Sequence, residues 1–290
     1  MIKKAILLAG GNGSRLYPST IGISKQLLPV YDKPLIYYPL SILLLAGIKE
    51  IMIIVTPENK DFFLKYLGDG SQWGVEISYG IQQSPRGIAD AILIGERFLG
   101  DEPFCLMLGD NIFYGDLMFL YTALEKFSTC TLFAYTVNDP ERFGVVKFDK
   151  WGKATQIVEK PKEKISNWAI PGLYLFDHTA IQKTKSLEPS GRGELEITDL
   201  HKLYLEEGSL DVEKMNRGLV WFDTGTPESM LEASNFLHTV EKTQSVKVAC
   251  LEEIALRKGL IDKQKLQDLI ESMPNSDYRN YCKTFLEETQ

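Results

Sequence analysis

The sequence predicts an α/β fold: a mixed, mostly parallel sheet with helices on both faces, a β-rich extension and a helical C-terminal tail. Three observations lead to this prediction. Continuously apolar runs of strand length alternate with helix-period segments through the first half, short strands follow one another after about residue 140, and from Pro227 the pattern is helical. Apolar strands of this kind are typical of sheets buried on both faces, and strand–helix alternation indicates right-handed parallel crossovers.

The first half contains the elements of the parallel sheet. The predicted strands are Ala5–Ala9, Ile51–Val55 and Phe104–Leu108, and the predicted helices are 35–46, a short helix over 62–67, and 88–98. Pro34 suits the first turn of a helix, and Gly47 and Gly100 suit helix ends, because proline has no N–H to leave unpaired and glycine adopts left-handed backbone.

The second half changes character. Strands are expected over 144–148 and 155–159 around a turn at 150–153, and again over 170–176. In the tail, Thr226 and Asp262 are predicted helix N-caps, and an apolar and aromatic stripe follows, formed by Leu266, Leu269, Ile270, Met273, Tyr278, Tyr281 and Phe285. Such a stripe must pack either on the main domain or on a second subunit.

Composition excludes several classes of protein. The 290 residues are 44% hydrophobic and 24% charged with a net charge of −7, which fits a large globular core and argues against binding to duplex nucleic acid. The 4 cysteines show no CxxC spacing and the 3 histidines are dispersed, so neither a disulfide framework nor a zinc site is expected. The apolar runs are too short for a signal peptide or a membrane span. We expect a cytoplasmic location, with neither nucleic acid nor membrane as partner.

A glycine-rich segment follows the first strand directly. Gly10-Gly11-Asn12-Gly13 lets backbone N–H groups approach an anion closely, and Arg15 adds a forked cation. Leu16 stands where a dinucleotide-binding GxGxxG loop has its third glycine, and no Gly-Lys-Ser/Thr follows, as a Walker A loop requires. The segment is a phosphate cradle of another type or a tight turn, and the residues alone favour neither.

Two aspartates follow apolar strands. Asp110 comes after the strand ending at Leu108, and Asp223 follows Val220-Trp221-Phe222. Ligands of open α/β sheets bind at such carboxyl ends, and two carboxylates without His or Cys suit Mg²⁺. Each is a turn or cap residue unless both face one pocket. Lys25 is likewise a solvated charge unless it reaches back to the phosphates that the glycine segment holds.

Two further segments carry polar groups suited to a sugar phosphate and a base. Glu159 and Lys160 end a strand before Pro161, where an acid and a lysine can bind hydroxyls and a phosphate; the alternative is an exposed charge pair. Gln82 lies in a loop before a helix, and its amide can both donate to and accept from a base edge.

Together these segments resemble the sugar nucleotidyltransferases, and within them the thymidylyl branch. The resemblance is carried by Leu8–Leu16, Ser24–Ser41, Leu108–Asn111, Glu159–Pro161, Gly193–Asp199, Trp221–Thr226 and Val248–Ala255, and it extends over essentially the whole chain. It implies a Rossmann-like core and an enzyme that condenses glucose 1-phosphate with dTTP to dTDP-glucose and pyrophosphate, a step towards dTDP-rhamnose and related sugars.

The resemblance also implies an organisation. A catalytic domain is expected over 1–240, with a nucleotide-binding part to about 140 and a sugar-binding part over 141–226. The segment 241–290 is expected to be regulatory or to lie at a subunit interface, in a homotetramer.

Roles carried over by position complete the expected site. Arg15 and Lys25 hold the triphosphate, Asp110 and Asp223 bind Mg²⁺, and Lys160 binds the sugar phosphate. The nucleotide site adds Leu8, Gly10, Gly11, Gly13, Gln82, Pro85, Gly87 and Gly109; the sugar site adds Gly144, Glu159, Gly172 and Tyr174; the candidate regulatory residues are Tyr114, Gly115 and Arg217.

Two departures from the family pattern leave alternatives open. The base loop has Arg86 and Asp90 where the family usually has Asp and Gln, so a uridylyltransferase making UDP-glucose remains an alternative. Asp116-Leu117 replaces the family's His-Asp, so feedback regulation is open too. From another class, a catalytically silent nucleotide-sugar sensor on the same fold is the alternative; such a sensor would be free to lose Lys25 or Asp223.

Overall fold

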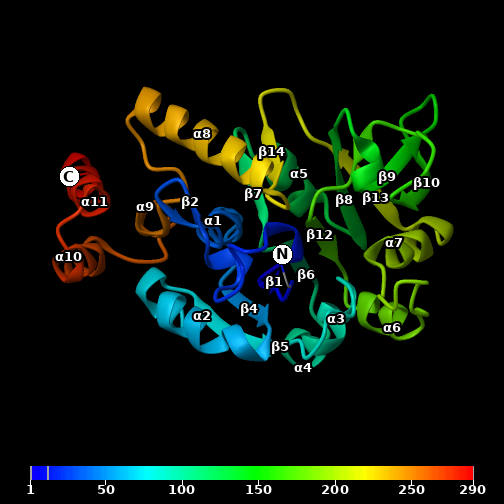
Figure 1. The fold of residues 1–290 in the computed structure, drawn as a ribbon, viewed down its shortest axis with the longest axis horizontal. Helices are drawn as coiled ribbons and strands as arrows, with labels where there is room; N and C mark the ends of the chain where they lie inside the picture. Colours follow the sequence, from blue (N-terminus) through cyan, green and yellow to red (C-terminus); the bar gives the residue numbers. More distant parts are fainter. Residues whose placement is uncertain (1, 12, 290) are drawn as a thin grey trace.

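A mixed sheet of ten strands forms the centre of the computed structural model, which describes residues 2–11 and 13–289 (Figure 1). Its strand order is β10-β9-β11-β8-β12-β6-β1-β4-β5, with β13 beside β8; β14 pairs with β7, and β2 with β3. Asn12 of the glycine-rich segment lies outside the described residues.

The strands are β1 (Lys4–Ala9), β2 (Pro29–Val30), β3 (Lys33–Pro34), β4 (Glu50–Val55), β5 (Glu76–Ile81), β6 (Phe104–Leu108), β7 (Asn111–Tyr114), β8 (Cys130–Thr136), β9 (Gly144–Phe148), β10 (Ala154–Glu159), β11 (Trp168–Ala169), β12 (Leu173–Phe176), β13 (Leu210–Lys214) and β14 (Val220–Asp223). The α-helices are α1 (Tyr37–Leu45), α2 (Lys60–Leu67), α3 (Asp90–Ile94), α4 (Glu96–Leu99), α5 (Met118–Lys126), α6 (Thr179–Lys185), α7 (Ile197–Glu206), α8 (Pro227–Gln244), α9 (Leu251–Arg257), α10 (Lys263–Ser272) and α11 (Asp277–Glu288).

The parallel half of the sheet is β5-β4-β1-β6. Successive side chains of β1 point to opposite faces of the sheet, and each face has its own hydrophobic core. Ala5 and Leu7 pack on the face covered by α1, and Ile6 packs on the opposite face with α3, α6 and α7. Because both faces are covered, the strands need apolar residues at every position. The predicted strands and the helices on both faces are therefore confirmed.

The other half of the sheet is mainly antiparallel, as the β-rich extension predicted. β12 pairs antiparallel with β6 and β8, and β9 pairs antiparallel with β10 and β11. The strand expected over 170–176 starts only at Leu173, because Pro171 has no N–H to donate to the ladder.

Two helix predictions were wrong in their bounds. The helix expected from 35 begins at Tyr37, because Pro34 belongs to the β2–β3 hairpin, whose turn contains Tyr31 at φ 62°. The helix expected over 88–98 is split into α3 and α4 at Gly95, against which the Ile6 side chain packs so closely that a Cβ there would lie 2.6 Å from Ile6 Cδ1.

The C-terminal helices begin where their caps predicted. The Thr226 hydroxyl accepts from Ser229 N–H at 3.2 Å, and the Asp262 carboxylate accepts from Lys265 N–H at 2.8 Å. α8 continues across the expected division at 240/241. α9 packs on α1, and α10 and α11 lie at the opposite end of the molecule from β9 and β10 (Figure 1).

Buried polar contacts join this tail to the main body. Glu252 of α9 accepts from Trp73 Nε1 at 3.1 Å and from Tyr278 Oη at 2.5 Å. Cys250 and Cys282, distant in sequence, are buried as free thiols with their Sγ atoms 3.7 Å apart. The aromatic stripe thus packs largely within the chain itself.

In the part of the chain that the structure describes, no helix combines the length and the apolar character needed to cross a membrane.

Candidate active site

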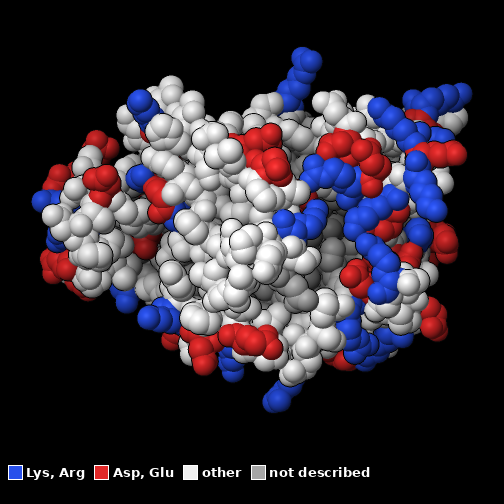
Figure 2. All heavy atoms as spheres, in the orientation of Figure 1, with Lys and Arg blue, Asp and Glu red and all other residues white. Residues whose placement is uncertain are grey.

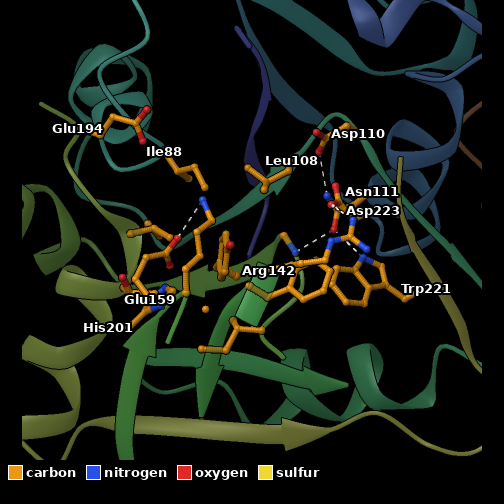
Figure 3. Close-up of a pocket in the computed structure, with 18 of the residues that line it drawn as sticks. Ile88, Leu108, Asp110, Asn111, Arg142, Glu159, Glu194, His201, Trp221 and Asp223 are labelled. Carbon is orange, nitrogen blue, oxygen red and sulfur yellow. Dashed lines mark hydrogen bonds and ion pairs between the residues drawn. The ribbon is translucent and has the colours of Figure 1, made fainter. Parts of the chain in front are cut away.

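A cavity of about 590 Å³ lies beyond the carboxyl ends of β6, β10 and β14. The predicted residues that line it are Arg15, Asp110, Gly144, Glu159, Lys160, Gly172, Tyr174 and Asp223. Figure 3 shows Asp110, Asn111 and Asp223 close together at one end of this cavity and Glu159 and His201 at the other. The cavity therefore extends from an acidic end to an end that contains Glu159 and His201.

Basic side chains surround this hollow although the chain as a whole is acidic. Figure 2 shows Lys and Arg side chains gathered beside the hollow, with acidic side chains among them; Arg15, Arg142, Lys160 and Arg192 are the basic residues of the lining. A local cationic rim can bind small anions irrespective of net charge.

Asp110 and Asp223 are brought together by a strand pair. β14 runs antiparallel to β7, which places Asp223 opposite Asn111, and Thr224 donates to the Asp110 carbonyl through N–H at 3.2 Å and Oγ1 at 2.8 Å. Burial, and after it the nearby negative charge of Asp110, raises the pKa of Asp223. Two facing oxygen donors of this kind fit a hard divalent cation such as Mg²⁺.

Lys25 lies beneath the same carboxylates. Its Nζ donates to Asp110 Oδ2 at 2.7 Å, and the side chain is only 7% exposed. Burial by itself raises the pKa of Asp110, but the charge and hydrogen bond of Lys25 together with the hydrogen bonds from Asn111 and the backbone outweigh it, so the pKa lies below the usual 3.8. Lys25 thus does reach back to the site, which sequence alone left open.

Asn111 fixes the acidic end. Its Nδ2 donates to Asp110 Oδ1 at 2.9 Å, and its Oδ1 accepts from Gly172 N–H at 3.0 Å and from Trp221 Nε1 at 2.7 Å. Because the amide oxygen already has two donors, its NH₂ group must face the carboxylate. The orientation of Asp110 is therefore set by its neighbour in sequence.

The glycine-rich segment brings Arg15 to the acidic end. A Cβ atom at Gly225 would lie 2.6 Å from the Arg15 guanidinium and 3.1 Å from Asp223 Oδ2, so this glycine leaves the space that the guanidinium occupies. Gly13 adopts φ 58°, and a Cβ there would lie 2.9 Å from Thr20. A side chain at Gly13 would be strained in the left-handed region, whereas a side chain at Gly225 would displace the Arg15 guanidinium.

Glu159 and Lys160 lie at the other end of the cavity. A Cβ at Gly144 would lie 2.9 Å from Thr198 and 3.2 Å from Glu159 Oε2, so the absence of a side chain here leaves room for Thr198 and for the Glu159 carboxylate. Lys160 adopts φ 41°, a conformation that costs a non-glycine residue about 1 kcal/mol and is frequent at functional sites. Its side chain is 49% exposed, with Nζ 3.5 Å from Glu159 Oε1.

The base loop lies beside the glycine-rich segment. Gln82 is buried and its Nε2 donates to Asp90 Oδ2 at 3.1 Å and to the Gly87 carbonyl at 3.3 Å. A Cβ at Gly10 would lie 2.5 Å from Gln82 Oε1. Gln82 and Gly10 are therefore in direct contact, whereas Pro85 is exposed in the loop.

The remaining predicted residues lie nearby or elsewhere. Leu8 and Gly109 meet through a backbone hydrogen bond of 2.8 Å, and a Cβ at Gly11 would meet nothing within 4 Å. Tyr114 and Gly115 line a second cavity of about 360 Å³ between α1 and α9, and Arg217 lines neither cavity.

Several lining residues were not predicted from the sequence. Arg142 NH2 lies 3.7 Å from Asp223 Oδ2, and Arg192 NH2 lies 3.6 Å from Glu159 Oε1. Thr198 Oγ1 and both ring nitrogens of His201 are buried without a hydrogen-bond partner among the described residues. Arg192 immediately precedes a segment that carried the resemblance, but Arg142 and His201 show no local pattern.

Comparisons with known proteins agree with this arrangement. Residues 4–240 match the family model described as Nucleotidyl transferase. The chain is 52% identical over 287 residues to glucose-1-phosphate thymidylyltransferase of Neisseria meningitidis, covering 98% of this chain and 100% of that protein. It is 47% identical to the enzyme of the same name from Mycobacterium tuberculosis, covering 98% and 99%.

Solved structures are similar as well. A Bacillus anthracis protein assigned as a glucose-1-phosphate thymidylyltransferase, solved with sucrose, has a TM-score of 0.75 and 40% identity, covering 80% of this chain and 94% of that one. A UDP-glucose pyrophosphorylase complexed with UDP-glucose has a TM-score of 0.74 and 26% identity, covering 83% and 100%. On the family match and these relatives, the chain belongs to the nucleotidyl transferase family.

Proposed function

We propose that this protein condenses glucose 1-phosphate with dTTP, giving dTDP-glucose and pyrophosphate. The observation that carries the proposal is the acidic pair Asp110 and Asp223 at one end of a cavity whose rim holds Arg15 and Arg142. Relatives at about half identity over nearly the whole chain, named for this reaction, support it.

The reaction needs charge neutralisation more than proton transfer. An oxygen of the sugar phosphate attacks the α-phosphorus of dTTP, and the bond to the β-phosphate oxygen breaks as pyrophosphate leaves. The nucleophile is already an anion at neutral pH, so no general base is required. Two unit charges at 4 Å repel by about 4 kcal/mol at an effective dielectric constant of 20, and this repulsion is the obstacle.

The basic residues of the site are positioned to cancel that repulsion. We assign Arg15 and Lys25 to the triphosphate and Lys160 to the sugar phosphate. Arg192, whose guanidinium lies 3.6 Å from Glu159, adds charge at the same end. Glu159 and the backbone of Gly144 then bind glucose hydroxyls, and Gln82 with Gly87 binds the base.

A divalent metal fits the acidic end. Asp110 and Asp223 would hold Mg²⁺, since both offer carboxylate oxygens and neither has His or Cys beside it in the lining. When bound, the ion supplies positive charge to the phosphates of the nucleotide. Lys25 contributes by holding Asp110 in place at 2.7 Å and keeping it ionised.

A pyrophosphate-release assay tests the proposal. The protein is incubated with glucose 1-phosphate, Mg²⁺ and each nucleoside triphosphate in turn, and dTTP is expected to give the highest rate. Preference for UTP would favour a uridylyltransferase; thymine and uracil differ by one methyl, worth about 1–3 kcal/mol in an apolar pocket. Silence with every nucleotide would favour a sensor and overturn the proposal.

The division of the chain into parts and the assembly of several copies remain predictions. We propose that 1–240 is the catalytic unit, that 241–290 serves regulation or assembly around the cavity lined by Tyr114 and Gly115, and that four copies assemble. Light scattering after size exclusion should give four times the mass of one chain; a monomer would contradict the assembly.

A further inference from the structure

The Gln82 amide has only one orientation that its surroundings permit. Its Nε2 donates to Asp90 Oδ2 at 3.1 Å and to the Gly87 carbonyl at 3.3 Å. Both partners are acceptors that cannot donate. A flipped amide would place Oε1 against a carboxylate and a carbonyl, so the contact with Asp90 fixes which end of the amide faces away.

The oxygen of the Gln82 amide, Oε1, faces away from Asp90 and accepts no hydrogen bond within the described residues. Gln82 Oε1 is directed at the glycine-rich segment, where a Cβ at Gly10 would lie 2.5 Å from it. None of the residues 2–11 and 13–289 donates a hydrogen bond to this oxygen. The amide thus keeps a free carbonyl oxygen beside the nucleotide site.

Asp90 is a buried hydrogen-bond partner of Gln82. It is 5% exposed at the start of α3, and its second oxygen, Oδ1, lies 3.8 Å from Nε of Arg86, which is exposed. The two carboxylate oxygens therefore have separate tasks: Oδ2 holds Gln82, and Oδ1 faces the loop. A buried carboxylate can accept hydrogen bonds but never offer one, unlike an amide at the same position.

We propose that Asp90 is a positioning residue for base selection. By fixing the Gln82 amide, it makes the nucleotide site present an oxygen acceptor, which pairs with a pyrimidine that carries a ring N–H. Thymine and uracil have this N–H; cytosine has a lone pair at the same ring position and would face Oε1 with an acceptor. The inference rests on the proposed function, in which Gln82 binds the base.

Asp90→Asn tests the inference with almost no change of size. An asparagine can offer either NH₂ or oxygen to Gln82, so position 90 no longer fixes the amide and only the Gly87 carbonyl still favours one orientation. In the wild type, kcat/KM for dTTP should exceed that for dCTP by roughly 10- to 100-fold or more, the usual cost of an unmade buried hydrogen bond. In Asp90→Asn this ratio should fall at least about tenfold, with KM for dTTP rising more than kcat falls.

Arg86→Gln is the matched control. It removes the charge beside Oδ1 and leaves the contact of Oδ2 with Gln82, so the dTTP/dCTP ratio should stay as in the wild type. Asp90→Ala is the second variant: only the Gly87 carbonyl then orients the amide, and the ratio should fall here too. An unchanged ratio in folded Asp90→Asn and Asp90→Ala, with melting temperatures like the wild type, would overturn the inference.

Failure of the proposed function gives a different result. If the wild type releases no pyrophosphate with dTTP, the reaction assignment is wrong. The dissociation constants of dTTP and dCTP, measured by calorimetry on the same variants, then make the same comparison, and equal ratios in wild type and Asp90→Asn overturn the role of Asp90.

Discussion

His201 should make the protein sensitive to mild acid. Its ring is fully buried against the rings of Tyr174 and Phe176, and neither nitrogen has a hydrogen-bond partner among the described residues. Burial lowers the pKa of His201 from 6.5 to about 3. Below pH 6.5 the imidazole therefore binds a proton in the unfolded chain but stays neutral in the folded chain. The free energy of unfolding decreases as the pH is lowered from 6.5 to about 3.

The size of the effect follows from the two pKa values. Each pH unit between them costs about 1.4 kcal/mol, so lowering the pH from 7 to 5 should remove about 2 kcal/mol of the free energy of unfolding through this residue. For a chain of 290 residues this corresponds to a fall in Tm of about 3 °C.

Comparison with His201→Leu isolates this contribution, because leucine has a similar volume and does not titrate. Thermal or urea unfolding of both proteins is measured at pH 7 and pH 5. Other groups titrate alike in both, so the wild type should lose about 2 kcal/mol more than the variant. Equal losses in the two proteins would show that His201 takes up its proton in the folded state and would refute the reasoning.

Three further predictions follow from single contacts. Lys160→Gly should leave Tm unchanged or raise it, since φ 41° suits glycine. Pyrophosphate release should fall sharply, because the ammonium group assigned to the sugar phosphate is lost; a parallel loss of stability would contradict this. Gly10→Ala should raise KM for dTTP more than it lowers kcat, because the new methyl displaces the Gln82 amide; an unaltered KM would show that this amide lies outside the nucleotide site. Cys250 is buried, and its contact with Cys282 together with burial raises its pKa, so it should react with a thiol reagent only after unfolding; rapid reaction in the native protein would contradict the tail packing.

Local signals in the sequence were sufficient for much of the fold. Strand β6 was predicted with its observed bounds because every residue of Phe104–Leu108 is apolar and both faces of the strand are covered. The caps at Thr226 and Asp262 were predicted because a side chain bonds to a backbone N–H only three residues away. Such interactions need no information from distant parts of the chain.

The misses required tertiary information. Gly95 divides a predicted helix because Ile6, from a strand far away in sequence, packs against it. Arg142 enters the site through its approach to Asp223, at 3.7 Å, which no spacing in the sequence reveals. The buried contact of Glu252 with Trp73 likewise depends on how the tail folds back onto the main body.

Candidate site residues could be named from the sequence, but their grouping could not. That Asp110 and Asp223 share a cavity depends on the pairing of β14 with β7.

The most direct test is the rate of pyrophosphate release and its Mg²⁺ dependence in the wild type, Asp110→Asn, Asp223→Asn and the double variant. If both carboxylates hold one ion that neutralises two phosphate reactants, each single change should lower turnover by about 10²–10³-fold while Tm is retained, and the double variant should be little worse than either single one. Near-normal turnover in either single variant, with Mg²⁺ dependence like that of the wild type, would show that the charge of the reactants is neutralised elsewhere.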